Sequence, residues 1–138
     1  MIVVDTSVVL AFMNRGDRAH GRVSAWMEGV EEGLVTTPLA LAEMDHLVRT
    51  RGGDAASVAL RRDLLDGAYA VEWWPEALAE TVAVAERHDQ LGLTDASLVA
   101  LAARLVTTRV ATLDERHFRT VAPLTGEPAF ALLPADAA

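Results

Sequence analysis

The sequence predicts an α/β protein in which a central, mostly parallel sheet is covered by helices on both faces. Short continuous apolar segments, typical of strands buried on both faces, alternate along the chain with longer segments of helical periodicity. The composition is that of a packed protein, since 51% of the 138 residues are hydrophobic and 23% are charged. This length fits one domain covering residues 1–138.

Five segments have the composition of strands, and polar or turn residues bound them. They are residues 2–4, 34–36, 70–74, 109–113 and 130–133. The last segment is expected to be an edge strand, and residues 134–138 after it are expected to fray.

Helical periodicity fills the segments between these strands. Helices are expected over about residues 8–13, 19–32, 38–51, 54–67, 76–90 and 94–105. Thr37, Asp54 and Thr94 are the expected N-cap residues, and Pro38 fits the first helical position after Thr37. Gly52-Gly53 is expected to separate two helices.

Cys and Lys are both missing from the sequence, and their absence excludes several kinds of chemistry. A chain without Cys has no disulfides, thiolate zinc sites, iron–sulfur clusters or Cys nucleophile. A chain without Lys has no Schiff-base lysine and no P-loop lysine. The His residues lack zinc-site spacing; they are His20, His46, His88 and His117. No segment has the pattern of a signal peptide or a membrane span, so a cytoplasmic protein without a membrane partner is expected.

The charge balance is acidic, with 20 Asp and Glu against 12 Arg and a net charge of −8. Such a surface repels phosphate backbones and disfavours non-specific binding of nucleic acids. A nucleic-acid substrate would therefore need a metal ion or a local Arg patch in the protein.

Four acidic residues fall where predicted strands end or where the following helices begin. Asp5 and Asp114 directly follow apolar strands, Glu43 lies in the second turn of a helix, and Asp95 follows the expected cap Thr94. Each of them alone also fits a turn, a helix start or a solvated face. Because the carboxyl ends of parallel strands share one edge of the sheet, we expect the four side chains to converge there.

Converging carboxylates repel one another, by about 4 kcal/mol for two charges about 4 Å apart at an effective dielectric near 20. A hard, oxygen-seeking cation relieves this repulsion, and Mg²⁺ fits best, with Mn²⁺ as the alternative. Such a site activates water and stabilises an in-line displacement at phosphorus. The four acids therefore predict metal-assisted phosphoryl chemistry.

Other residues have a less specific pattern. Arg116 fits a phosphate clamp or an ordinary surface Arg, and Asp89 is ambiguous between the site and the surface. Trp73-Trp74 fits the core or a subunit interface better than a platform for stacking bases. Ser7 lacks the surroundings of a nucleophile elbow.

Four segments together resemble PIN-domain ribonucleases and, more narrowly, the VapC-type toxins of type II toxin–antitoxin pairs. They are Ile2–Ser7, Leu41–Met44 around Glu43, Leu91–Ala102 and Ala111–Phe118. The resemblance implies a three-layer α/β/α sandwich and Mg²⁺- or Mn²⁺-dependent endonucleolytic cleavage of RNA, commonly tRNA or rRNA. It also implies a homodimer and a small cognate antitoxin.

The resemblance also assigns roles to single residues. Asp5, Glu43, Asp95 and Asp114 match the acidic quartet of the family. Asp5 and Asp95 would be the principal metal ligands, and Asp114 would bind the metal directly or through water. Glu43 would bind the metal or orient the attacking water, and Thr6 matches a hydroxyl residue that orients the site. The implied products carry a 5′-phosphate and a 3′-hydroxyl.

Three other functions stay open at this point. A phosphatase that forms a phospho-aspartyl intermediate on Asp5 is disfavoured, because position 7 is Ser and no Lys exists to bind phosphate. A non-catalytic acidic module that only binds a partner is the second. A DNA-directed nuclease is the third, because the sequence has no recognisable reader of the RNA 2′-hydroxyl.

Overall fold

The computed structural model describes residues 1–137 and places five strands in one parallel sheet. The strands are β1 (Ile2–Val4), β2 (Leu34–Thr36), β3 (Ala70–Val71), β4 (Arg109–Ala111) and β5 (Ala131–Leu133). Their order is β3-β2-β1-β4-β5, and every neighbouring pair is parallel. The chain moves outward from β1 through β2 and β3 on one side and through β4 and β5 on the other. The carboxyl ends of β1 and β4 therefore form a topological switch point, where open α/β sheets bind ligands.

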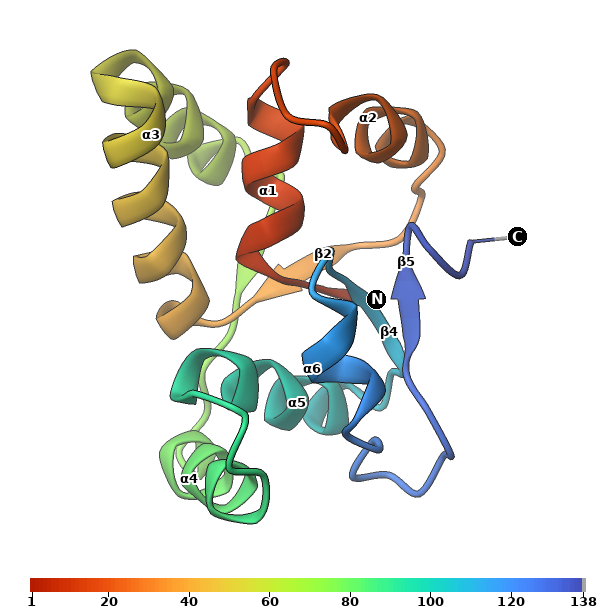
Figure 1. Ribbon diagram of the computed structural model, residues 1–138. Coiled ribbons are helices and arrows are strands. Elements are labelled where there is room, and N and C mark those ends of the chain that lie inside the picture. The colour runs from red at the N-terminus through yellow and green to blue at the C-terminus, as the bar shows by residue number, and fades with distance from the viewer. Residues whose placement is uncertain (138) are drawn as a thin grey trace.

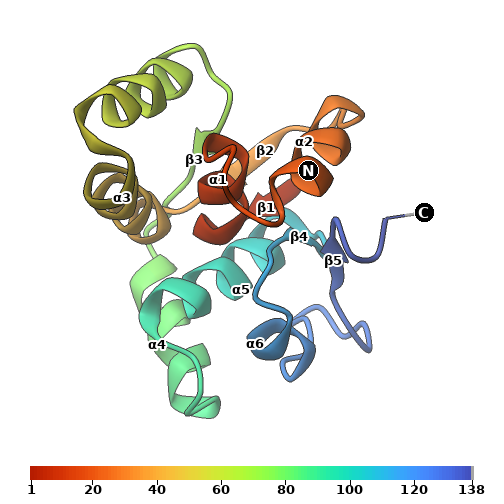
Figure 2. The same cartoon turned by 45° about the horizontal axis from the view of Figure 1, so that its top comes forward.

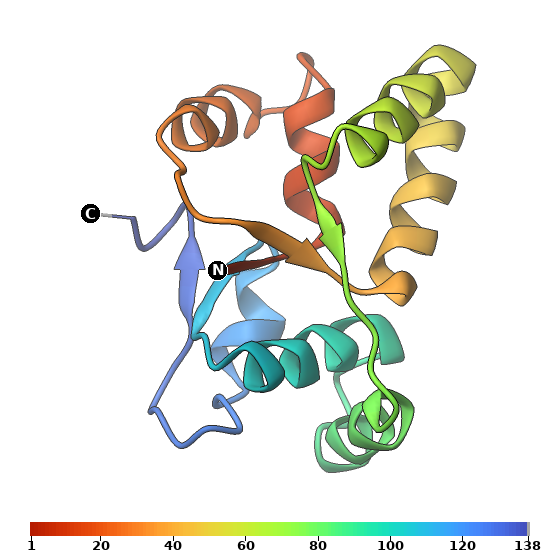
Figure 3. The ribbon, with the colours of Figure 1, turned by 180° about the vertical axis from the view of Figure 1, so that it is seen from behind.

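Helices cover both faces of this sheet, as the sequence predicts. They are α1 (Thr6–Met13), α2 (His20–Glu28), α3 (Pro38–Leu65), α4 (Ala77–Arg87), α5 (Leu93–Leu105) and α6 (Glu115–Arg119). Helices α1 and α2 lie above the sheet in Figure 1, with α3 beside α1, whereas α4, α5 and α6 lie below it. Figure 3 shows the same layers from behind. The predicted three-layer α/β/α fold is confirmed.

The central strand β1 explains why apolar runs in this chain are continuous rather than alternating. All three of its residues are 0% exposed, because helices pack on both sides of it. Val8 and Val9 of α1 belong to the same buried core as Leu98 and Leu101 of α5. The site residues that follow β1 therefore start from a rigid, fully packed strand.

Helix α3 is the longest helix, and it bends at Gly53. The Gly53 backbone has φ 78° and ψ −171°, a conformation that residues with a Cβ rarely adopt. The two halves of α3 run in different directions in Figure 2, as expected from the glycine pair. Neither α3 nor any other helix within residues 1–137 is long and apolar enough to cross a membrane.

The start of α5 differs from the prediction. Gly92 is the N-cap, with an extended backbone at φ −78° and ψ 174°, and Leu93 is the first helical residue. Thr94 therefore lies inside the first turn, and the prediction that it caps the helix is wrong. Its carbonyl oxygen accepts a hydrogen bond of 2.6 Å from the Ser97 hydroxyl. This shift leaves Asp95 in the first turn of α5.

Three strands are shorter than predicted, β5 by its first residue only, and one helix was not predicted. Strand β3 has only the exposed residues Ala70 and Val71, consistent with its place at the edge of the sheet. Strand β4 ends at Ala111, so two residues separate it from Asp114. Asp114 then caps the five-residue helix α6, which is too short to show a periodic pattern.

The segment after β5 forms a turn over residues 134–136 rather than a frayed tail. The Asp136 carboxylate accepts a hydrogen bond of 2.8 Å from the backbone N–H of Leu132. It also receives two hydrogen bonds from the Arg119 guanidinium, of 2.8 and 2.7 Å. This pairing ties the turn to α6, and Ala138 lies outside the described residues.

Candidate functional site

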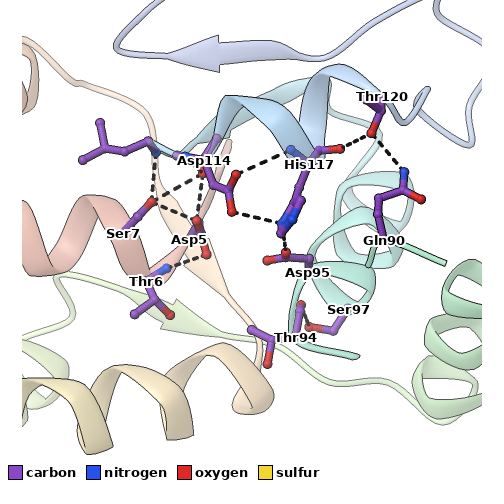
Figure 4. Close-up of polar contacts among 12 residues, drawn as sticks. Asp5, Thr6, Ser7, Gln90, Thr94, Asp95, Ser97, Asp114, His117 and Thr120 are labelled. Carbon is purple, nitrogen blue, oxygen red and sulfur yellow. Dashed lines mark hydrogen bonds and ion pairs between the residues drawn. The ribbon is translucent and has the colours of Figure 1, made fainter. Parts of the chain in front are cut away.

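The predicted acidic residues lie on four elements around the switch point of the sheet. Asp5 follows β1 and caps α1, Asp114 caps α6 beyond β4, and Asp95 lies in the first turn of α5. Glu43 lies in the second turn of α3 with an exposed side chain. Figure 4 shows the carboxyl groups of Asp5, Asp114 and Asp95 directed toward the same region.

Neutral hydrogen-bond donors hold the Asp5 carboxylate, which is only 5% exposed. It accepts hydrogen bonds from the backbone N–H of Thr6 at 2.8 Å, the Ser7 hydroxyl at 2.9 Å and the Thr112 hydroxyl at 2.8 Å. We call these four residues the Asp5 corner. The donors fix the direction of the carboxylate but bring no positive charge to it.

Burial therefore controls the protonation of the Asp5 carboxyl group. Burial raises the pKa of Asp5 from 3.8 to about 6, although the hydrogen bonds from Thr112, Ser7 and Thr6 act in the opposite direction. The negative charge of Asp95 also raises the pKa of Asp5, so the two carboxylates influence each other. A cation placed between them would lower this electrostatic cost.

A second group, which we call the His117 cluster, consists of Asp95, Asp114 and His117. The His117 Nδ1 atom lies 2.9 Å from Asp95 Oδ2 and 3.0 Å from Asp114 Oδ2. One ligand atom from each of the three residues lies within 4.8 Å of the other two. Within residues 1–137, no other group of three His, Asp or Glu side chains meets this spacing. The cluster has the donor spacing of a metal site.

The pKa of Asp95 shows how Glu43 acts on the cluster. Burial raises the pKa of Asp95, whereas the hydrogen bond and the charge of His117 lower it. The negative charges of Asp114 and Glu43 raise it further. Glu43 is thus electrostatically connected to Asp95 despite its exposed position.

Ser7 and Thr112 are functional candidates that the sequence analysis missed. The Ser7 hydroxyl donates to Asp5 and accepts a hydrogen bond of 2.9 Å from the backbone N–H of Leu113. The Thr112 hydroxyl donates to Asp5 and accepts one of 2.9 Å from the backbone N–H of Asp114. These two side chains therefore join the end of β1 to the segment that carries Asp114. Their signal in the sequence is a hydroxyl two residues from a candidate acid.

His117 was also missed as a member of the site. Its spacing to the other His residues has no zinc pattern. The informative spacing was the one to Asp114, because residues three apart share a face of a helix. This relation appears only once α6 is recognised as a helix.

Thr6 contributes to the Asp5 corner through its backbone rather than its side chain. Its hydroxyl instead donates a hydrogen bond of 3.4 Å to the carbonyl oxygen of Ala40, in the first turn of α3. Thr6 is 2% exposed, so this contact lies inside the protein. The side chain of Thr6 therefore holds α1 against α3, the helix that carries Glu43.

Arg116 and Asp89 are both exposed. Arg116 lies on α6 and lines a surface pocket together with Ser7, Asp114 and two neighbours, Leu113 and Glu115. Asp89 lies between α4 and α5, and it forms no ion pair with a described residue. Arg116 is thus adjacent to the site, whereas no contact among residues 1–137 connects Asp89 with it.

The two neighbouring Trp residues have different surroundings. Trp74 is 6% exposed, its Nε1 donates a hydrogen bond of 2.9 Å to Glu80, and the Arg104 guanidinium lies over its ring. Trp73 is 40% exposed. Trp74 therefore belongs to the core, as expected, and only Trp73 presents its ring to the surface.

Comparison with known proteins places this fold and site in a family context. Residues 2–123 match the PIN domain family. The chain is 37% identical over 128 residues to Ribonuclease VapC26 of Mycobacterium tuberculosis (strain ATCC 25618 / H37Rv), which covers 91% of this chain and 95% of that protein. It also matches the crystal structure of Mycobacterium tuberculosis VapC20, described as a sarcin-ricin loop cleaving toxin. That match has a TM-score of 0.74 and 26% identity, over 80% of this chain and 87% of VapC20.

Proposed function

Because the chain belongs to the PIN domain family, we propose that it is a divalent-metal-dependent endoribonuclease and the toxin of a toxin–antitoxin pair. The observation that carries the metal dependence is the approach of three carboxylates, from Asp5, Asp95 and Asp114, at the switch point of the sheet. Burial and mutual repulsion raise the pKa values of Asp5 and Asp95, so a cation would stabilise the ionised forms.

The donor set fits a divalent cation. Carboxylate oxygens of Asp95 and Asp114 and the imidazole nitrogen of His117 lie within ligand spacing of one another, and the Asp5 carboxylate faces the same region. Mg²⁺ binds through a few carboxylates and keeps several waters, and Mn²⁺ accepts the same ligands. When bound, such an ion lowers the pKa of water and neutralises charge on the phosphate oxygens.

The residues of the chain then take separate roles in hydrolysis. Asp5 and Asp95 would hold the ion, and Asp114 would bind it directly or through water. Glu43 would bind the ion or orient the water that attacks the phosphate in line, and the products would carry a 5′-phosphate and a 3′-hydroxyl. Ser7 keeps the Asp5 carboxylate in one direction, together with Thr112.

Arg116 is the proposed contact for a phosphate of the substrate. It is exposed beside Asp114, in a chain whose net charge of −8 otherwise repels RNA. A guanidinium can bind a phosphate through two hydrogen bonds. Arg116 and the ion would together supply the local positive charge that RNA binding requires.

The partners follow from the same family relationship. We propose that the substrate is a structured RNA of the tRNA or rRNA class, which is supported by the description of VapC20 as a sarcin-ricin loop cleaving toxin. A small cognate antitoxin would neutralise the protein, and the protein would act as a homodimer in the cytoplasm. Sequencing of RNA ends after controlled expression would identify the target.

Cleavage of RNA by the purified protein tests the proposal. We expect cleavage in Mg²⁺ or Mn²⁺, loss of cleavage in EDTA, and recovery when the ion is restored. Asp95→Asn should abolish cleavage, whereas Asp89→Asn removes a nearby exposed carboxylate and should leave the rate unchanged. Equal rates for the two variants would remove Asp95 from the site.

The same protein preparation discriminates between the other functions. Cleavage of DNA in preference to RNA would indicate a DNA-directed nuclease. A covalent phosphate on Asp5, trapped by acid quenching, would indicate a phosphatase. If the folded protein cleaves no nucleic acid in Mg²⁺ or in Mn²⁺, the result would indicate a non-catalytic module that only binds a partner.

A further inference from the structure

We propose that His117 is a nitrogen ligand of the ion and makes the site prefer Mn²⁺ over Mg²⁺. This inference rests on the proposed function, because it assumes that the carboxylates of Asp95 and Asp114 hold a divalent ion. It adds a residue outside the acidic quartet and assigns it control over which ion binds.

The position of the His117 ring fits a metal ligand. His117 Nδ1 lies between the two carboxylates, 2.9 Å from Asp95 Oδ2 and 3.0 Å from Asp114 Oδ2. In an octahedral site with bonds of about 2.1 Å, neighbouring ligand atoms lie about 3.0 Å apart. The nitrogen and each of the two oxygens therefore already have the spacing of adjacent ligands.

Helix α6 is held firmly in place, so the position of the His117 ring is fixed by the fold. Phe118 is 1% exposed, and its ring packs edge-on against Phe130 with the centroids 6.3 Å apart. Arg119, the last residue of α6, is paired with Asp136. Contacts of the two residues that follow His117 thus fix the helix that presents its ring to the carboxylates.

The chemistry of an imidazole ligand favours Mn²⁺ over Mg²⁺. Mg²⁺ strongly prefers oxygen ligands, whereas first-row transition-metal ions also accept imidazole nitrogen, with Mn²⁺ the weakest binder among them. Nδ1 faces carboxylate oxygens, which only accept, so it carries a hydrogen in this arrangement. Ligation requires this proton to pass to solvent, and the bound ring is then the neutral tautomer with its one hydrogen on Nε2. An ion between Asp95 and Asp114 must either accept this nitrogen or displace the ring. Mn²⁺ accepts it more readily than Mg²⁺ does.

The test uses the full chain loaded with Mn²⁺ alone, without RNA. Pulsed electron paramagnetic resonance detects the coupling of a directly bound imidazole nitrogen to Mn²⁺. We expect this coupling in the wild-type protein and its loss in His117→Asn, which can offer an amide oxygen in place of Nδ1. His88→Asn is the matched control, because His88 lies at the end of α4 and outside the cluster, and it should keep the coupling.

Calorimetric binding of the two ions gives the selectivity. We expect His117→Asn to weaken Mn²⁺ binding by about tenfold or more and to change Mg²⁺ binding by less than about threefold. In His117→Asn, the dissociation constant for Mg²⁺ divided by that for Mn²⁺ should therefore fall toward one. An unchanged ratio would overturn the proposed selectivity.

The outcomes separate this inference from the proposed function. Mn²⁺ that binds the wild-type protein without nitrogen coupling would overturn the role of His117 and leave the metal-dependent nuclease standing. A folded wild-type protein that binds neither ion would overturn the proposed function itself. The wild-type spectrum decides the ligation even if His117→Asn fails to fold.

Discussion

The Asp5 corner and the His117 cluster solve the same problem of holding carboxylates close together, but they do so by different means. In the Asp5 corner, three neutral donors surround one buried carboxylate. In the His117 cluster, one ring lies between two half-buried carboxylates. Neutral donors fix a carboxylate without balancing its charge, whereas an imidazole can do both.

This difference gives the two groups different tasks. The Asp5 corner is rigid, because its donors come from the segments directly after β1 and β4. Its negative charge remains available for a cation. The His117 cluster is more exposed and offers a nitrogen, so it is the part of the site where the identity of the ion can be decided.

The largest expected effect comes from Asp5→Asn, which removes the charge of the Asp5 corner and keeps its shape. RNA cleavage should fall by about a thousandfold or more, because an amide cannot replace the anionic ligand. Gel-based cleavage rates in Mg²⁺ and in Mn²⁺ measure this. Circular dichroism should show an unchanged fold, and a normal cleavage rate would remove Asp5 from the mechanism.

The second effect concerns the stability of the metal-free protein. The pKa of Asp5 rises from 3.8 to about 6 on folding, so the protonated form favours the folded state. This contribution is complete below pH 3.8 and is lost as the pH rises through about 6. The loss amounts to about 3 kcal/mol, at about 1.4 kcal/mol for each pH unit. Urea unfolding in EDTA from pH 4 to pH 7.5 measures it.

Asp5→Asn is the reference for this second prediction, since it cannot titrate at position 5. As the pH rises, the free energy of unfolding should fall in the wild type relative to Asp5→Asn, because only the wild type ionises at position 5. A difference independent of pH would mean that the carboxylate of Asp5 is not desolvated, and the contrast with the half-exposed cluster would disappear.

The third effect tests the neutral donors themselves. Thr112→Val removes the hydroxyl that donates to Asp5 and accepts from the Asp114 backbone. Unfolding should become easier by about 1–3 kcal/mol, because buried partners lose a hydrogen bond. Thr81→Val is the matched control, since the buried Thr81 hydroxyl has no hydrogen-bond partner among residues 1–137. Thermal unfolding of both variants should show a clear loss for Thr112→Val alone.

The smallest effect concerns Arg116, beside the His117 cluster. Arg116→Ala should lower kcat/KM for RNA by about three- to tenfold, mainly through KM, because it removes a charge that contacts phosphate in the ground state as well. Arg22→Ala removes an exposed Arg from α2 and serves as control. Equal effects of both changes would indicate only a general influence of net charge.

The sequence was sufficient to place Asp5 and Asp114 at one edge of the sheet, because Asp5 directly follows β1, Asp114 follows β4 after two residues, and parallel topology brings strand ends together. The start of α5 was misplaced because Thr94-Asp95 has the composition of a local cap. The chain uses Gly92 instead, whose extended backbone starts the helix two residues earlier. The backbone conformation of Gly92 thus determines where α5 begins, although Thr94 has the composition of an N-cap.

Ser7, Thr112 and His117 could not be assigned from the sequence for a different reason. Hydroxyl residues next to acids are common, and only the pairing of β1 with β4 shows that Ser7 and Thr112 reach the same carboxylate. His117 depends on α6, whose five residues are fewer than two helical turns. These residues are defined by tertiary contacts rather than by periodicity.

The bond between Asp136 and Arg119 ties the last turn of the described chain to the helix that carries part of the site. Helix α6 carries Asp114 at its start and His117 in its middle, so anything that tilts this helix moves both at once. Substitutions at position 136 are therefore expected to shift the positions of Asp114 and His117 without changing any residue that contacts RNA. Natural sequence drift at this surface position would be a gradual way to adjust the enzyme.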